Sequence, residues 1–102
     1  MNQAQMMAQV KKMQAEMAKA QQDLASTSVA GTAGGNAVEV TMTCDYRVTG
    51  VKLAKEAVDP DDTETLEDLL VVAINAAVGK AQETSARRMS AVTGGLNIPG
   101  LM

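Results

Sequence analysis

The chain has 102 residues, with nine Lys or Arg against twelve Asp or Glu, no His, one Cys and a single aromatic residue, Tyr46. The length supports one domain, 1–102, and the lack of His excludes a Ser-His-Asp triad and leaves a Cys/His zinc site without ligands. Alanine and methionine make up more than half of the apolar residues. The core should therefore be thin, and we expect a second copy of the chain to complete it.

Residues 2–26 are predicted to form a helix. Along them an apolar residue recurs with a period of 3.5, which gives a narrow seam of Met6, Val10, Met13, Met17, Ala20 and Leu24. A helix that buries only such a stripe is expected to project from the body or to pair with another helix.

Residues 27–54 are predicted to form an antiparallel sheet of three short strands. The turn Gly34-Gly35-Asn36 tolerates positive φ, and apolar and polar residues alternate between positions 38 and 43. Gly50 marks an expected bulge in the third strand. Cys44, late in the second strand, is expected to be a small buried apolar residue, and as the single cysteine it cannot form an internal disulfide.

An acidic connector over residues 55–62 precedes a second long helix, predicted over 62–92, and a short tail, 93–102. Asp61 is the candidate N-cap, with Glu64 three residues later as in a capping box. Residues 56–68 hold seven acids and no base. Acids at a helix N-terminus are explained by the helix dipole, and the segment lacks the Gly and the distal Glu of a calcium loop, so no metal site is expected.

Basic residues are concentrated on the two helices. Residues 1–22 carry three lysines against Glu16, and residues 79–102 carry three basic residues against Glu83. Such side chains on projecting helices can neutralise DNA phosphates, although they could instead be solvated faces that keep Ala-rich helices in solution. Six phosphate contacts in a dimer would give a log–log salt slope of about −5. The candidate DNA-binding residues are Lys11, Lys12, Lys19, Lys80, Arg87 and Arg88.

Several motifs occur in an order that is specific when they are taken together. They are the Met/Gln-rich opening helix, residues 29–35 and 38–41, residues 67–69 followed by Ala73, Asn75 and Ala77, and an ending with Gly94-Gly95 and Pro99. Together they resemble the YbaB/EbfC family of bacterial nucleoid-associated DNA-binding proteins over nearly the whole chain. The resemblance implies an α+β, α-β-β-β-α homodimer whose sheets associate and whose two long helices project like tweezers. It also implies that the dimer binds DNA and helps to organise the nucleoid or to modulate expression.

The predicted protein is thus a homodimeric, non-enzymatic binder of double-stranded DNA in the cytoplasm and nucleoid. With Tyr46 alone, recognition of single strands by base stacking is disfavoured. No cofactor, small-molecule substrate or membrane is expected, since the longest apolar run, residues 69–74, is too short to span a bilayer and the opening residues do not resemble a signal peptide. The alternative is a protein-interaction or scaffold module that docks a partner helix on the 3.5-period seam.

Overall fold

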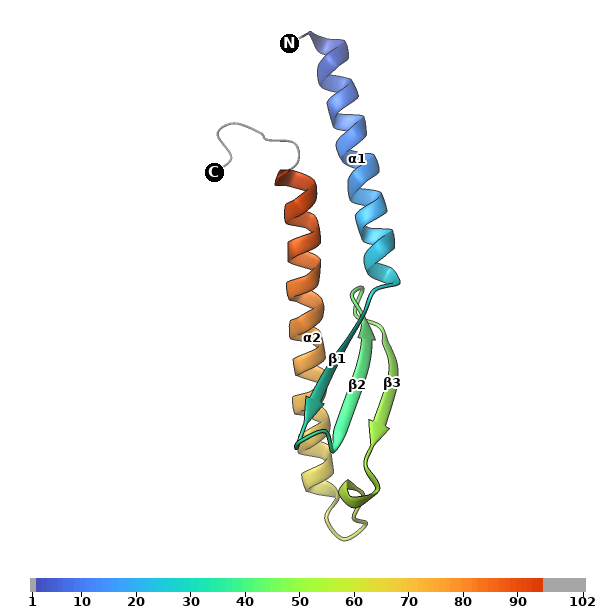
Figure 1. The fold of residues 1–102 in the computed structure, drawn as a ribbon, viewed down its shortest axis with the longest axis vertical. Helices are drawn as coiled ribbons and strands as arrows, with labels where there is room; N and C mark the ends of the chain where they lie inside the picture. The colour runs from blue at the N-terminus through green and yellow to red at the C-terminus, as the bar shows by residue number, and fades with distance from the viewer. Residues whose placement is uncertain (1, 95–102) are drawn as a thin grey trace.

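The structure is a computed structural model that describes residues 2–94. In chain order its elements are α1 (Gln3–Ala25), β1 (Ser28–Ala33), β2 (Val38–Thr43), β3 (Val48–Leu53), the short 3-10 helix η1 (Lys55–Ala57) and α2 (Thr63–Gly94). The strands pair in the order β1-β2-β3, all antiparallel (Figure 1). The predicted α-β-β-β-α arrangement is confirmed. Most of the predicted tail, residues 95–102, lies outside the described residues.

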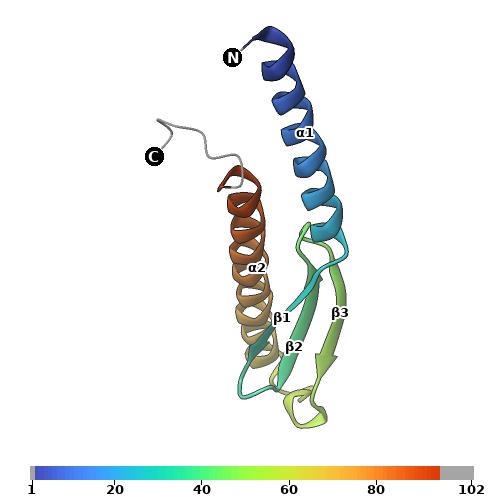
Figure 2. The same ribbon diagram turned by 45° about the horizontal axis from the view of Figure 1, so that its top comes forward.

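The molecule is elongated because its helices are much longer than its strands. Its extents are 70 × 24 × 16 Å and its radius of gyration is 19.6 Å, whereas a compact chain of about 100 residues has a radius near 13 Å. A six-residue strand spans about 20 Å, but the 32 residues of α2 span about 48 Å. Both helices extend past the same end of the sheet (Figures 1 and 2). We call α1 and residues 80–94 of α2 the arms, and the remainder the body.

Side-chain caps set where the helices begin. At the start of α1, Asn2 Oδ1 accepts a hydrogen bond from the Gln5 amide at 2.8 Å, and the Gln5 side chain accepts one from the Asn2 amide. At the start of α2, Asp62 accepts from both the amide and the hydroxyl of Thr65. The expectation that Asp61 is the cap is therefore wrong by one residue.

The sheet contains the expected turn and bulge. Gly34, Gly35 and Asn36 all have φ between 63° and 72°. Thr41 pairs with Gly50 while the next residue of β2, Met42, pairs with Val48, so β3 carries one extra residue beside Gly50.

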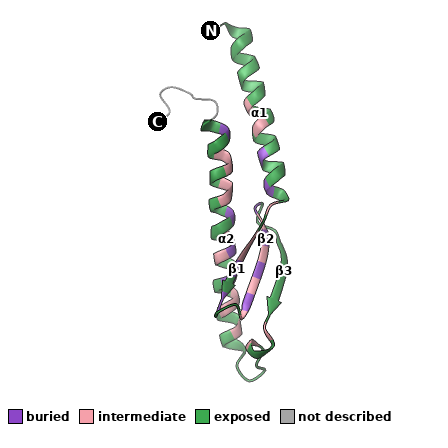
Figure 3. Cartoon of the chain, viewed as in Figure 1, coloured by how far each residue is buried: buried purple, intermediate pink, exposed green. Residues whose placement is uncertain are grey.

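The core lies between α2 and the first two strands. Gly31 of β1 sits against the helix backbone so closely that a Cβ there would lie 2.3 Å from the Ala73 oxygen and 2.3 Å from the Ala77 nitrogen. Ala73 and Ala77 are fully buried, and every second residue of β2 is buried beneath the helix (Figure 3). Small residues on both surfaces therefore bring α2 directly onto β1. Cys44 is buried at the end of this core, as expected.

Strand β3 presents apolar side chains that α2 does not cover. Val51 and Leu53 pair with the buried Val40 and Val38, so the four side chains point to the same face of the sheet. Yet Val51 remains 48% exposed, because the close approach at Gly31 places α2 over β1 and β2. Every residue of β3 is exposed. The sheet is thus half covered, and β3 forms one of its edges.

Candidate nucleic-acid interface

Charge is separated along the long axis of the molecule. The basic residues of α1 and of the last part of α2 lie on the arms, while the acidic segment 56–68 forms η1, the following loop and the start of α2 at the opposite end of the body (Figure 1). The net charge of −3 therefore conceals two ends of opposite sign. An anionic polymer is attracted to the arms and repelled from the far end of the body.

The three lysines of α1 are exposed, and none is in an ion pair with another residue among 2–94. Lys12 and Lys19 are seven residues apart and so share one face of the helix. That face is turned away from the seam, because Lys12 follows the seam residue Val10 by two positions, a rotation of about 200°. Exposed lysine side chains of this kind are among the groups that contact DNA phosphates.

On the α2 arm, Lys80 and Arg87 are also seven residues apart on one face. Both are exposed. Arg87 Nη1 lies 2.9 Å from Oε1 of Glu83, one turn earlier, with both side chains about two-thirds exposed. Such a solvated pair contributes at most a few tenths of a kcal/mol, roughly 0.3–0.5, so it does not prevent Arg87 from turning to a phosphate.

Arg88 has a structural partner. Its Nη2 lies 3.1 Å from Oδ2 of Asp23, which joins the two arms near the base of α1, and its side chain is only 36% exposed. Arg88 was predicted from the sequence to bind phosphate, and no role was predicted for Asp23. A signal for Asp23 was present, because it flanks the seam directly before Leu24, the position from which charges pair with a neighbouring helix.

A turn between β2 and β3 lies at the arm end of the sheet. Tyr46 occupies it with φ 69°, a left-handed conformation that is uncommon for residues other than Gly, Asn and Asp. Thr43 donates its hydroxyl to Asp45 and its amide to the Arg47 oxygen, which closes the turn. Arg47 was not among the predicted site residues; it is exposed, but Asp45 in the same turn balances its charge.

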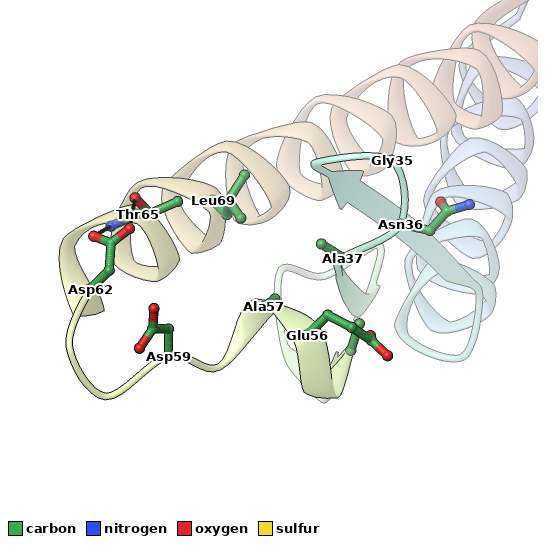
Figure 4. Close-up of a pocket in the computed structure, with 10 residues that line it drawn as sticks. Gly35, Asn36, Ala37, Glu56, Ala57, Asp59, Asp62, Thr65 and Leu69 are labelled. Carbon is green, nitrogen blue, oxygen red and sulfur yellow. Dashed lines mark hydrogen bonds between the residues drawn. The ribbon is translucent and has the colours of Figure 1, made fainter.

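The acidic end of the body is explained by local structure. An open pocket of about 410 Å³ there is lined by Glu56, Asp59, Asp62, Leu69 and six other residues (Figure 4). Asp59 accepts a hydrogen bond from the Asp61 amide, and Asp62 caps α2. Within residues 2–94, no three potential ligands are grouped as a metal site would require. None of the described helices combines the length and hydropathy needed to cross a membrane.

Comparison with known proteins assigns the fold and the family. Residues 1–96 match the YbaB/EbfC DNA-binding family. The chain is 50% identical over 96 residues to a nucleoid-associated protein of Chloroflexus aurantiacus, covering 94% of this chain and 96% of that one. It is 47% identical over 100 residues to a nucleoid-associated protein of Roseiflexus, covering 98% and 99% of the two chains.

A crystal structure of an uncharacterised Helicobacter pylori protein shares the fold, with a TM-score of 0.75 and 18% identity over 95% of this chain and 99% of that one. The helix–sheet–helix arrangement, the basic arms and the match over residues 1–96 agree with one another. This chain belongs to the YbaB/EbfC DNA-binding family.

Proposed function

We propose that the protein is a homodimeric, non-enzymatic component of the nucleoid that binds double-stranded DNA mainly through phosphate contacts from its arms. The observation that carries this proposal is the separation of charge. At one end are the lysines of α1, which form no ion pair within residues 2–94, and at the other end is the acidic segment 56–68. The names of its relatives, nucleoid-associated proteins, support the cellular role of organising the nucleoid or modulating expression.

The uncovered face of β3 supports the homodimer. Val48, Val51 and Leu53 are between 42% and 51% exposed, on the face of the sheet that the core uses. A contiguous apolar surface of this kind on a small domain is typical of an interface. A second copy covers it symmetrically, because most small oligomers are two-fold dimers.

The basic residues of the α2 arm lie on the same face of the helix as Leu69 in the body. Lys80 and Arg87 follow Leu69 by 11 and 18 residues, about three and five helical turns, so the three side chains share one face. Leu69 itself lies against Gly34 in the turn between β1 and β2. Lys80 and Arg87 therefore form one exposed basic face along the α2 arm.

Recognition in this proposal depends on phosphate and shape. The candidate residues are Lys11, Lys12, Lys19, Lys80 and Arg87, with Arg88 partly committed to Asp23. Lysine neutralises phosphate as a point charge and carries little information about the base sequence. We therefore expect modest sequence preference, and Tyr46 alone is no platform for stacking successive bases of a single strand.

One observation favours a second function, as a scaffold for a partner helix. The outer seam residues of α1 are open, with Met6 55% and Val10 54% exposed. A pull-down that recovers one stoichiometric protein partner after nuclease treatment would support that function. Recovery of DNA with the protein, and loss of every other protein on nuclease treatment, would support DNA binding alone.

The test of the DNA proposal is a binding titration with a duplex and with one of its separated strands between about 50 and 200 mM salt. We expect tighter binding to the duplex, with log affinity falling against log salt with a slope of about −5 for six phosphate contacts per dimer. A variant with Lys11→Ala and Lys12→Ala should bind more weakly and with a shallower slope, because the slope decreases by about 0.9 for every phosphate that is no longer neutralised.

The matched control for that variant is Gln9→Ala with Gln14→Ala, which shortens two neighbouring exposed side chains without changing charge. It should bind as the wild type does. Binding that does not depend on salt, or equal weakening in the lysine and glutamine variants, would overturn the assignment of the phosphate-binding residues to the arm.

A further inference from the structure

The acidic residue at the base of α1, Asp23, occupies an unfavourable position for its own helix. It lies in the last turn of α1, which ends at Ala25, and a carboxylate there opposes the helix dipole, whose negative end is the C-terminus. Lys19 is four residues earlier, but a lysine on the N-terminal side is the less favourable order for a helical ion pair. Local helix stability therefore does not explain the carboxylate.

The backbone around Asp23 is held in place by hydrogen bonds. Its carbonyl accepts the Thr27 hydroxyl at 2.6 Å and the Ser26 hydroxyl at 3.1 Å. The next carbonyl, that of Leu24, accepts the Cys44 amide at 3.1 Å, and the Leu24 side chain is buried. The Asp23 carboxylate thus extends from a point fixed to the sheet, at the base of α1, where α2 lies beside it (Figures 1 and 2).

Arg88 is held at this point more firmly than its neighbour Arg87 is held on the same arm. The Arg88 side chain is 36% exposed and donates to Asp23 on the other helix, whereas Arg87 is 69% exposed and pairs with Glu83 one turn away. Because Asp23 lies in the last turn of α1, the Arg88 guanidinium is also close to the negative end of that helix, which attracts a cation. The carboxylate and the helix end together retain Arg88 beside α1.

We propose that Asp23 is a positioning residue of the DNA interface, which retains Arg88 and so withholds one guanidinium from phosphate. A carboxylate and a phosphate present similar oxygens to the arginine fork, so the two compete for it. A phosphate that takes Arg88 also comes close to an Asp23 carboxylate without its partner, and like charges repel. This role rests on the proposed binding of DNA by the arms. It makes the protein bind DNA less tightly than its basic residues allow.

A cycle of four chains in a salt titration on duplex DNA tests this role: the wild type, Asp23→Asn, Arg88→Ala and the double variant. Asp23→Asn should bind more tightly, and its log–log salt slope should be steeper by about 0.9 for each Arg88 that reaches a phosphate. In the chain with Arg88→Ala, the same replacement of Asp23 should leave the slope unchanged, because no guanidinium remains to be released.

Two further variants separate the ion pair from the charge alone. Glu16→Gln removes an acid two turns earlier on the same face of α1, and Glu16 forms no ion pair with another residue among 2–94. It should keep the wild-type slope. Asp23→Glu retains a carboxylate at the position and should also keep the wild-type slope. A steeper slope in the Glu16→Gln chain, or a steepening by Asp23→Asn that persists without Arg88, would overturn the proposal.

Side-chain NMR of the arginines provides a measurement that needs no altered protein beyond the assignment. On addition of duplex DNA to the wild type, the guanidinium signal of Arg88 should stay in place while that of Arg87 shifts. An Arg88 signal that shifts as much as that of Arg87 would overturn the proposal. An unchanged slope in Asp23→Asn, with salt-dependent binding by the wild type and weaker binding by the Lys11→Ala and Lys12→Ala variant, would overturn it and leave the proposed function standing. No binding of duplex by the wild type would overturn both.

Discussion

In the body, α2 lies so close to β1 that Gly31 leaves no space for a Cβ between strand and helix. On the α1 arm, by contrast, most side chains are exposed and burial is confined to the residues that face α2. Both regions are rich in Ala and poor in large side chains. The difference teaches that small residues serve two purposes here: in the body they permit a close approach of backbones, and on the arm they leave a slender helix whose charges face solvent.

The largest effect is expected where the body packs most tightly. Gly31→Ala places a Cβ 2.3 Å from two backbone atoms of α2, which cannot move aside as a flexible side chain can. We expect a loss of about 3 kcal/mol or more in the free energy of unfolding, measured by urea denaturation. An unchanged denaturation midpoint would mean that α2 does not rest on β1 in this way.

The second-largest effect, on dimer formation, is expected at the face of β3 that α2 does not cover. Val51→Lys puts a charge in the middle of the apolar face of β3, and sedimentation should change from twice the chain mass of 10.6 kDa to a monomer or an unfolded chain. Thr32→Lys adds the same charge at an exposed β-branched residue of β1 and should stay dimeric. A Val51→Lys chain that remains a folded dimer at low micromolar concentration would exclude β3 from the interface.

Replacing a glycine of α2 by alanine is expected to raise stability, whereas the same replacement at Gly31 lowers it. Gly79 is exposed and a Cβ there would meet nothing within 4 Å. Gly79→Ala should therefore stabilise the chain by about 1 kcal/mol through helix propensity, seen as a higher melting temperature. A lower melting temperature would indicate that Gly79 is covered in the assembled protein.

The smallest effect is expected for the ion pair between the arms. A double-mutant cycle with Asp23→Ala and Arg88→Ala should give a coupling energy of about 0.2–1 kcal/mol, because both side chains remain accessible to water. Urea denaturation of the four chains measures it. A coupling energy of zero would show that the pair does not hold α1 to α2 in solution.

The fold could be predicted because apolar residues recur with a different period in the segments that form helices than in the segments that form strands. The seam of α1, the alternation in β2 and the turn at Gly34 are local patterns, and each appears where the sequence placed it. The cap of α2 was misplaced by one residue because Asp59 engages the Asp61 amide and carries the turn through Pro60 before the helix begins.

Two features of the candidate site could not be predicted from local patterns. The pairing of Asp23 with Arg88 joins residues 65 positions apart, and only the packing of the arms brings them together. The exposure of β3 depends on where α2 crosses the sheet. That position is set on another strand, β1, where Gly31 allows the backbone of α2 to approach closely. The basic arms and the acidic segment of the body were both predicted from the sequence, and the structure adds that they lie at opposite ends of the long axis.

The central claim is that DNA binds to the arms and not to the body, and two charge-matched variants test it most directly. One replaces Lys11, Lys12 and Lys19 of α1 by Ala; the other replaces Arg47, Lys52 and Lys55 of the body by Ala. In a salt titration on duplex DNA, we expect the slope for the arm variant to be shallower by at least about 2 and the slope for the body variant to stay within about 1 of the wild type. A body variant whose slope decreases as much as that of the arm variant would contradict the account.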